Sequence, residues 1–361
     1  MASDKKLVLV LGATGAQGIA VIDQLLAPSP DGSPSPYAVR ALTRDPSGKR
    51  ASALARKGVE CVQGSLNDIP SILLALQGVY GAWINVDGFT VGEEKETYLG
   101  IRIFELAKQV RSVKHFVWSS IDYGYKKSGY DPIYQCGHTD AKGRVADWMK
   151  TQASLSDGMT WTVVTTCPYM EMLGIHMFGP LHKREDGTFV FATPVGEGRV
   201  PMIALRDLGL FARYTFDHRD TVSGQNLEIA SDIVNWDYLV STFKKVTGQK
   251  AVVLHQSLDE WFNNLENIDL PLANDINKGV KVEGVTTWRK NFTAWWSLYR
   301  DNIVVRDMGW IRRINPQSYT LEKWMRENKY TGQLQMDVLK NVEDGKGDAS
   351  VRLNQKVISN L

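Results

Sequence analysis

Short apolar runs alternate with longer amphipathic segments through the first half of the chain. The runs end at glycine or polar residues, as buried strands of a parallel sheet do, and the segments between them carry apolar residues at helical spacing. Strands are predicted at residues 6–12, 37–44, 59–65, 78–86, 113–121 and 160–168. Helices are predicted at residues 16–26, 51–55, 71–77 and 94–110 and in the segment that contains Lys142. Repeated strand–helix units imply right-handed crossovers, so the pattern predicts an α/β fold of the Rossmann type, with a doubly wound parallel sheet.

The alternation ends near residue 170. Beyond it, residues 187–203 are predicted to form a hairpin and residues 227–231 a late strand, whereas residues 236–330 are helical and rich in tryptophan. This part of the chain predicts a smaller, mainly helical C-terminal domain. We expect a Rossmann domain at residues 1–170 and about 204–235. A smaller substrate-pocket domain is expected at about residues 171–203 and 236–330, and a polar C-terminal tail at residues 331–361.

Composition and charge narrow the class of protein. The 361 residues are 43% hydrophobic and 23% charged, which is typical of a soluble globular protein. The net charge is +2 and no basic block stands out, so nothing indicates direct binding to nucleic acid. The apolar run at residues 7–11 is too short for a signal peptide or a membrane span, and the three cysteines lack metal-ligand spacing. We therefore expect a cytoplasmic protein with no membrane segment and no metal site.

A glycine-rich loop follows the first predicted strand. The sequence GATGAQG places Gly12, Gly15 and Gly18 three residues apart, directly after the strand and at the start of a helix. Glycine allows a sharp turn and a close approach of the backbone to a pyrophosphate, whose charge then lies at the helix N-terminus. A tight strand–helix turn would need glycine too, but the surrounding strand–helix units favour a dinucleotide-binding site.

The end of the second strand distinguishes NAD from NADP. An acidic residue there binds the ribose hydroxyls of NAD, whereas a basic residue accommodates the 2′-phosphate of NADP. Arg44 occupies the position, and Lys49 and Arg50 follow closely. Asp45 is adjacent to Arg44 and would suit the ribose of NAD. Alternatively, Arg44 and Asp45 form an ordinary ion pair on the surface and bind no cofactor. The placement of Arg44 favours NADP(H).

Several motifs in the same order resemble those of one known family. GATGAQG, TRDP, GSLND, VKHFVWSS, HTDAK and VPMIALRDLG are similar to motifs of the NmrA-like family of atypical short-chain dehydrogenase/reductases, over residues 5–240, with fungal members closest. The resemblance implies a Rossmann domain, a smaller C-terminal domain and NADP(H) as cofactor. It assigns the pyrophosphate to Gly12, Thr14, Gly15, Ala16, Gln17 and Gly18, and the 2′-phosphate to Arg44. It assigns the adenine to Ser65 and Leu66, the nicotinamide ribose to Asn85 and Val86, and the nicotinamide to Pro168 and Tyr169.

The resemblance also locates a catalytic position that this chain has changed. Lys142 matches the lysine of the reductase Tyr-x-x-x-Lys pair, but His138 stands where the acid tyrosine would be. Lysine binds ribose hydroxyls and lowers the pKa of a neighbouring acid, and histidine relays protons near neutral pH. Both residues are also ordinary on the exposed face of a helix. The substitution fits the family and removes the standard reason to expect carbonyl reduction.

Other side chains near the strand ends can replace the tyrosine. The fifth strand ends at Ser120 and Asp122, and Tyr130 lies in the loop before the helix that carries Lys142. Serine at a strand end often caps a turn, and loop tyrosines often only pack. The sequence does not choose among His138, Ser120, Asp122 and Tyr130.

The tryptophans of the second half predict either an aromatic-walled pocket or a helical core. With Asp122 or Glu171 nearby, such a pocket would suit a flat or cationic small molecule. The favoured function is NADP(H)-dependent reduction of a C=O or C=N bond of a bulky aromatic natural product in secondary metabolism. One alternative is a redox-sensing NADP-binding transcriptional co-regulator, with a protein partner and a nuclear location. Another is a non-redox, acid–base cyclisation or rearrangement in the same pocket.

Overall fold

The chain divides into two compact units. The computed structural model describes residues 5–272, 286–335 and 351–361. Unit 1 comprises Met1–Asp122, Ala141–Thr166 and Leu208–Ile229, and unit 2 comprises Tyr123–Asp140, Cys167–Asp207 and Ala230–Leu361. Residues 123–140, which were expected in the Rossmann domain, fall in unit 2.

Unit 1 contains a seven-stranded sheet in which every neighbouring pair of strands is parallel. Its strands are β1 (Lys6–Leu11), β2 (Tyr37–Thr43), β3 (Glu60–Gln63), β4 (Gly81–Ile84), β5 (His115–Ile121), β6 (Thr160–Thr166) and β10 (Asn226–Glu228). They lie in the order β10-β6-β5-β4-β1-β2-β3, so the winding reverses between β1 and β4. The predicted α/β, doubly wound fold is confirmed, and its ligand crevice is expected beyond the carboxyl ends of β1 and β4.

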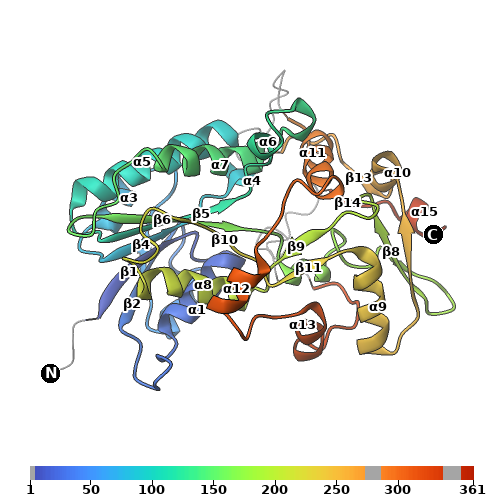
Figure 1. The fold of residues 1–361 in the computed structure, drawn as a ribbon, viewed down its shortest axis with the longest axis horizontal. Coiled ribbons are helices and arrows are strands. Elements are labelled where there is room, and N and C mark those ends of the chain that lie inside the picture. The colour runs from blue at the N-terminus through green and yellow to red at the C-terminus, as the bar shows by residue number, and fades with distance from the viewer. Residues whose placement is uncertain (1–4, 273–285, 336–350) are drawn as a thin grey trace. The chain divides into compact units, whose positions relative to one another are not determined.

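Helices cover both faces of this sheet (Figure 1). The helices with residues in unit 1 are α1 (Ala16–Leu26), α2 (Lys49–Arg56), α3 (Ile69–Leu76), α4 (Gly88–Val91), α5 (Glu93–Val110), α7 (Gly137–Met149) and α8 (Leu205–Asp217). Figure 1 shows α3, α5 and α7 above the sheet and α1 and α8 below it. The predicted stripe on α5 is buried: Leu99, Ile103 and Leu106 pack in one cluster with Phe116 and Trp118 of β5. This packing places the first turns of α5 beside the ends of β4 and β5.

Unit 2 combines helices with short strands. Its helices are α6 (Gly124–Lys127), α9 (Trp236–Thr247), α10 (Leu258–Asn263), α11 (Trp288–Arg300), α12 (Met308–Ile314), α13 (Leu321–Glu327) and α15 (Gln355–Ile358), and two 3-10 turns cover Pro132–Tyr134 and Met170–Gly174. Its strands are β7 (His182–Lys183), β8 (Phe189–Thr193), β9 (Val200–Met202), β11 (Asp232–Val234), β12 (Ala251–His255), β13 (Leu265–Glu266) and β14 (Arg352–Leu353).

One expectation about unit 2 needs correction. The predicted hairpin over residues 187–203 is wrong, because β8 pairs with β7 and β12 whereas β9 pairs with β11. The connection between β8 and β9 packs closely against the end of α11 instead, since a Cβ at Gly198 would lie 2.4 Å from the carbonyl oxygen of Tyr299. Within the expected polar tail, β14 pairs with β13. Residues 336–350 of that tail lie outside the described residues.

The tryptophans of unit 2 mostly fill its core. Trp236, Trp261, Trp295 and Trp296 are at most 3% exposed. Trp296 meets the other three in edge-to-face contacts, with ring centroids 4.8 to 5.8 Å apart. Such packing is typical of a buried aromatic core. Of the two readings left open by the sequence, these four side chains support the core.

Candidate functional site

The glycine loop after β1 has a shape that larger residues would disturb. Gly12 has a φ of +81°, and a Cβ there would lie 2.8 Å from the carbonyl oxygen of Asn85. A Cβ at Gly18 would lie 2.2 Å from the carbonyl oxygen of Gly12. Gly15 N–H donates to that same oxygen at 3.0 Å, which closes the turn. The backbone of the loop therefore packs tightly against the start of α1 and the end of β4.

The N-terminus of α1 has the form of an anion cradle. Gly15 is its N-cap residue, with extended backbone (φ −80°, ψ 168°), and as a glycine it has no side chain of its own to cap this helix end. A Cβ built at Gly15 would meet only the carbonyl oxygen of Gly12, at 3.3 Å. The first N–H groups of a helix and the positive end of its dipole attract anions. Thr14, Ala16 and Gln17 complete this loop and helix start.

Basic side chains follow β2, and the neighbouring acid belongs to a turn. Arg44 is exposed directly after the strand. Asp45 accepts hydrogen bonds from the backbone N–H of Ser47 at 2.9 Å and from its hydroxyl at 2.5 Å. Arg50 donates to the carbonyl oxygen of Thr14 at 3.0 Å, which brings a guanidinium to the glycine loop. The charge beside the loop is therefore largely positive.

The ends of β3 and β4 carry the remaining predicted cofactor residues of unit 1. Ser65 accepts a hydrogen bond from the backbone N–H of Asn67 at 3.2 Å, and Leu66 packs partly buried against the core. Asn85 N–H donates to the carbonyl oxygen of Leu11 at 3.3 Å, so the residue after β4 lies beside the end of β1. Val86 is buried.

Oxygen atoms surround the Lys142 ammonium. Its Nζ donates to the carbonyl oxygen of Val86 at 2.7 Å and to Asn85 Oδ1 at 3.1 Å, and it lies 3.4 Å from the carbonyl oxygen of Ser119. The Trp118 ring lies 5.2 Å from Nζ, and its indole N–H donates to the Lys142 carbonyl oxygen at 3.1 Å. The structure thus brings Lys142 to the two residues predicted at the nicotinamide ribose.

Sequence reasoning missed the carboxyl group that pairs with this lysine. Glu96 Oε1 lies 2.9 Å from Lys142 Nζ, and the Glu96 side chain is 0% exposed. Burial raises the pKa of Glu96 to about 7, and the lysine charge opposes that rise. A signal was present: Glu96 lies on the stripe of α5 that continues to Leu99 and Ile103. An acid on a buried stripe needs a partner.

Ser119, Ser120 and Asp122 are all buried at or just beyond the end of β5. Ser119 donates through its hydroxyl to Gln17 Oε1 at 2.7 Å, which connects β5 to the start of α1. The Ser120 hydroxyl donates to the carbonyl oxygen of Ile121 at 3.2 Å. A catalytic role for Ser120 or Asp122 stays a prediction.

His138 lies in a polar and aromatic cluster within unit 2. Asn291 donates through Nδ2 to His138 Nδ1 at 2.8 Å, and Cys136 Sγ lies 3.3 Å from the same nitrogen. The imidazole stacks on Phe292 with ring centroids 5.5 Å apart. Because an amide N–H points at Nδ1, that nitrogen accepts, and the neutral ring carries its proton on Nε2. The cluster therefore fixes the tautomer of His138.

The remaining predicted residues also lie in unit 2. Tyr130 has a φ of +67°, is 51% exposed and packs edge-on against Tyr123 and Tyr125. The backbone of Pro168 and Tyr169 pairs with Ile203, whose N–H donates to the Pro168 carbonyl oxygen at 2.9 Å. Their roles toward a cofactor stay predictions.

Glu171 is engaged within unit 2. Its carboxylate accepts from Leu205 N–H at 3.1 Å and from the Trp324 indole at 3.3 Å. Burial raises the pKa of Glu171, and these hydrogen bonds oppose the rise. The contacts indicate a structural carboxylate.

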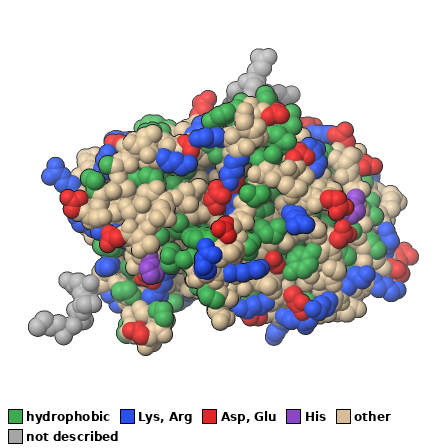
Figure 2. Space-filling view, viewed as in Figure 1, with side chains coloured by type: hydrophobic (Ala, Val, Ile, Leu, Met, Phe, Trp, Pro, Cys, Tyr) green, Lys and Arg blue, Asp and Glu red, His purple; other side chains and the backbone are tan. Residues whose placement is uncertain are grey.

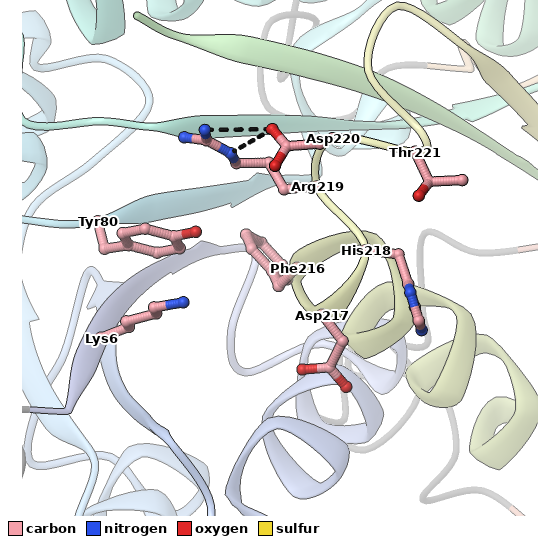
Figure 3. A pocket seen from close by; sticks show the side chains of 8 residues that line it. All are labelled: Lys6, Tyr80, Phe216, Asp217, His218, Arg219, Asp220 and Thr221. Atoms are coloured by element: carbon pink, nitrogen blue, oxygen red, sulfur yellow. Dashed lines mark hydrogen bonds and ion pairs between the residues drawn. The ribbon is translucent and has the colours of Figure 1, made fainter. Parts of the chain in front are cut away.

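A separate hollow lies at the amino end of β1, the end of that strand opposite to the glycine loop. Figure 3 shows the side chains that line it. The hollow has a volume of about 400 Å³ and is lined by Lys6, Tyr80, Phe216, Asp217, His218, Arg219, Asp220 and Thr221. Lys6 begins β1, whereas Gly12 follows its carboxyl end. Figure 3 shows Arg219 paired with Asp220 at its rim. This hollow is unrelated to the predicted cofactor site.

Three further properties of the described residues are their surface charge, their potential metal-binding groups and the apolarity of their helices. On the face seen in Figure 2, acidic and basic side chains are interspersed. Within the described residues, no group of three or more His, Cys, Asp or Glu side chains is arranged to hold a metal ion. No described helix has the length and apolarity needed to cross a membrane.

Known proteins match the chain over most of its length. Residues 4–301 match the NmrA-like family. The NmrA-like family domain-containing oxidoreductase malD of Malbranchea aurantiaca is 28% identical over 287 residues, which cover 75% of this chain and 80% of the relative.

Two solved structures share the fold. The structure of NmrA, a negative transcriptional regulator, in complex with NADP has a TM-score of 0.66 and 17% identity, covering 90% of this chain and 95% of that one. The NADPH-dependent quinone oxidoreductase QOR2 of Escherichia coli, complexed with NADPH, has a TM-score of 0.65 and 19% identity, covering 89% and 99%. Because the family match spans well over half of its residues, the chain belongs to the NmrA-like family.

Proposed function

We propose that the chain binds NADP(H) and reduces a C=O or C=N bond of a bulky aromatic natural product in the cytoplasm. The observation that carries the proposal is the glycine loop at the switch between β1 and β4, whose tight backbone and glycine N-cap at the start of a helix suit a pyrophosphate. The cofactor, when bound, supplies a hydride. The malD relative is named an oxidoreductase, which favours an enzyme over a binding protein.

Residues of unit 1 would hold the cofactor. Gly15 and the first turn of α1 would bind the pyrophosphate, and Arg44 the 2′-phosphate. Asp45 already accepts two hydrogen bonds from Ser47, so it is less suited to the ribose of NAD. Lys142 would fix the β4 end, through Asn85, beside the nicotinamide ribose.

A proton must accompany the hydride. His138 is our first choice, because its tautomer leaves a proton on Nε2, an atom that can donate. Ser120, Asp122 and Tyr130 are the other groups that can replace the absent tyrosine. Replacing each in turn, with NADPH binding measured beside turnover, identifies the donor as the residue whose loss stops turnover without weakening binding.

Two experiments test the proposal. Calorimetric titration with NADPH and NADP⁺ tests binding, and single-turnover oxidation of bound NADPH across a panel of imines, quinones and ketones tests reduction. Binding without oxidation by any substrate, with unequal affinity for the two cofactor forms, would instead support a redox-sensing regulator with a protein partner. Product formed without NADPH consumption would support the acid–base cyclisation or rearrangement. Absence of NADPH binding would overturn all three.

A further inference from the structure

Glu96 is a buried acid for which the proposed reaction has no role. It lies in the first turns of α5, and its side chain is 0% exposed. Removing a carboxylate from water is costly unless an opposite charge or aligned donors replace the solvent. Neither Glu96 oxygen meets hydrogen-bond geometry with a donor among the described residues, so the ion pair with Lys142 is the compensation that the structure offers.

The Glu96 carboxyl occupies space that is open because residue 88 is a glycine. A Cβ added at Gly88 would lie 2.2 Å from Glu96 Oε2, so a larger residue there would displace the carboxyl. Gly88 begins α4, directly after Asp87, and α4 follows the Asn85–Val86 end of β4. The Glu96 carboxyl therefore lies beside Gly88 at the start of α4, two residues after Val86, whose carbonyl oxygen Lys142 contacts.

Burial, together with the charges around Glu96, makes its proton sensitive to pH near neutrality. Among the described residues, Lys142 on α7 lowers the pKa of Glu96, whereas Asp87 before α4 and Glu93 on α5 raise it. Glu93 is itself paired with Arg144 on α7. Burial is the largest effect, and the resulting pKa is about 7. The Glu96–Lys142 pair is therefore neutral above this pH and carries one positive charge below it.

We propose that Glu96 positions Lys142 and, through its own proton, makes the preference of the site for reduced over oxidised cofactor depend on pH. The inference rests on the proposed function, which puts the nicotinamide ribose at Asn85 and Val86. The oxidised nicotinamide ring carries a positive charge and the reduced ring is neutral. When Glu96 is protonated, the uncompensated Lys142 ammonium repels only the oxidised ring. Low pH thus favours NADPH, and high pH brings the two affinities closer.

The test is the ratio of two dissociation constants. Calorimetry at fixed ionic strength gives the Kd of NADP⁺ and of NADPH from about pH 6 to about pH 8, on either side of the Glu96 pKa of about 7. Both forms carry the same 2′-phosphate, which itself titrates near pH 6, so its contribution cancels in the ratio. We expect the ratio of Kd(NADP⁺) to Kd(NADPH) to be about tenfold larger at the acid end, from one unit charge at an effective dielectric constant of about 20.

Two variants separate this effect from a general loss of structure. Glu96→Gln keeps the shape of the side chain without its charge, so it should hold the large, acid-like ratio at every pH. Glu94→Gln makes the same chemical change at an exposed position of the same helix and should follow the unchanged protein. If Glu96→Gln does not fold, the pH dependence of the unchanged protein still decides.

The outcomes distinguish this inference from the proposed function. Binding of both cofactors with a pH-independent ratio overturns the role of Glu96 alone, as does an equal pH dependence in Glu96→Gln. Absence of binding of either cofactor at every pH overturns the proposed function, and the inference with it.

Discussion

Gly18→Ala should destabilise the fold, whereas Gly15→Ala should weaken cofactor binding and leave the stability nearly unchanged. At Gly18 the new Cβ would lie 2.2 Å from Gly12 O and 2.7 Å from Ala13 Cα, both of them backbone atoms that cannot rotate away. Overpacking of this kind typically costs about 1–3 kcal/mol. At roughly 2–4 °C for each kcal/mol, the midpoint of thermal unfolding should fall by several degrees.

Gly15→Ala is the matched change in the same loop. Its Cβ would meet one atom, Gly12 O, at 3.3 Å, and a φ of −80° suits alanine. The stability should change by less than about 1 kcal/mol, because a small loss of N-cap preference is offset by a less flexible unfolded chain. NADPH binding should weaken about tenfold or more, since the methyl group stands where the pyrophosphate approaches the backbone. Circular dichroism measures the unfolding midpoint and calorimetry the affinity. If Gly15→Ala binds NADPH as tightly as the unchanged protein, the loop is only a strand–helix turn. If Gly18→Ala melts at the same temperature as the unchanged protein, the tight packing at Gly18 is refuted.

Three further changes test separate parts of the site. Arg44→Ala should weaken NADP⁺ binding about ten- to a hundredfold and NAD⁺ binding little, because only the 2′-phosphate differs; equal weakening in calorimetry at one salt concentration would contradict this. Glu96 holds its proton to a higher pH in the folded chain (about 7) than its ordinary 4.5, so it should lower the free energy of unfolding by about 3 kcal/mol in total as pH rises through that window. Urea unfolding at several pH values should show this part of the slope missing in Glu96→Gln, and an identical slope would refute it. Asn291→Asp places a carboxylate at His138 Nδ1 and should raise the pKa of His138, which an NMR titration of the imidazole measures; no upward shift would argue against the contact.

The features that could be predicted from the sequence were local ones. Apolar runs such as residues 6–12 predicted the strands, and the stripe from Leu99 to Leu106 predicted α5, because each pattern lies within one element. The glycine loop was equally local. The hairpin prediction failed because β8 pairs with β12, a strand far along the chain, and no pattern within residues 187–203 indicates that partner.

The site chemistry depended on contacts between distant residues. Glu96 was detectable as an acid on an apolar stripe, but its pairing with Lys142 required the packing of α5 against α7. The tautomer of His138 depends on Asn291, which lies 153 residues away in the sequence. The tryptophans gave no local signal to separate core from pocket, since both environments favour large aromatic side chains.

The most direct test of hydride transfer uses NADPH that carries deuterium at both C4 positions of its nicotinamide. The labelled cofactor is bound to the chain and mixed with the imines and ketones of the panel, whose reduced carbon keeps the transferred atom, and the products are analysed by mass spectrometry and NMR. We predict that one deuterium per molecule appears on the carbon of the reduced C=O or C=N bond of an aromatic substrate. A product that contains no deuterium and forms without NADPH oxidation would contradict the proposed reductase.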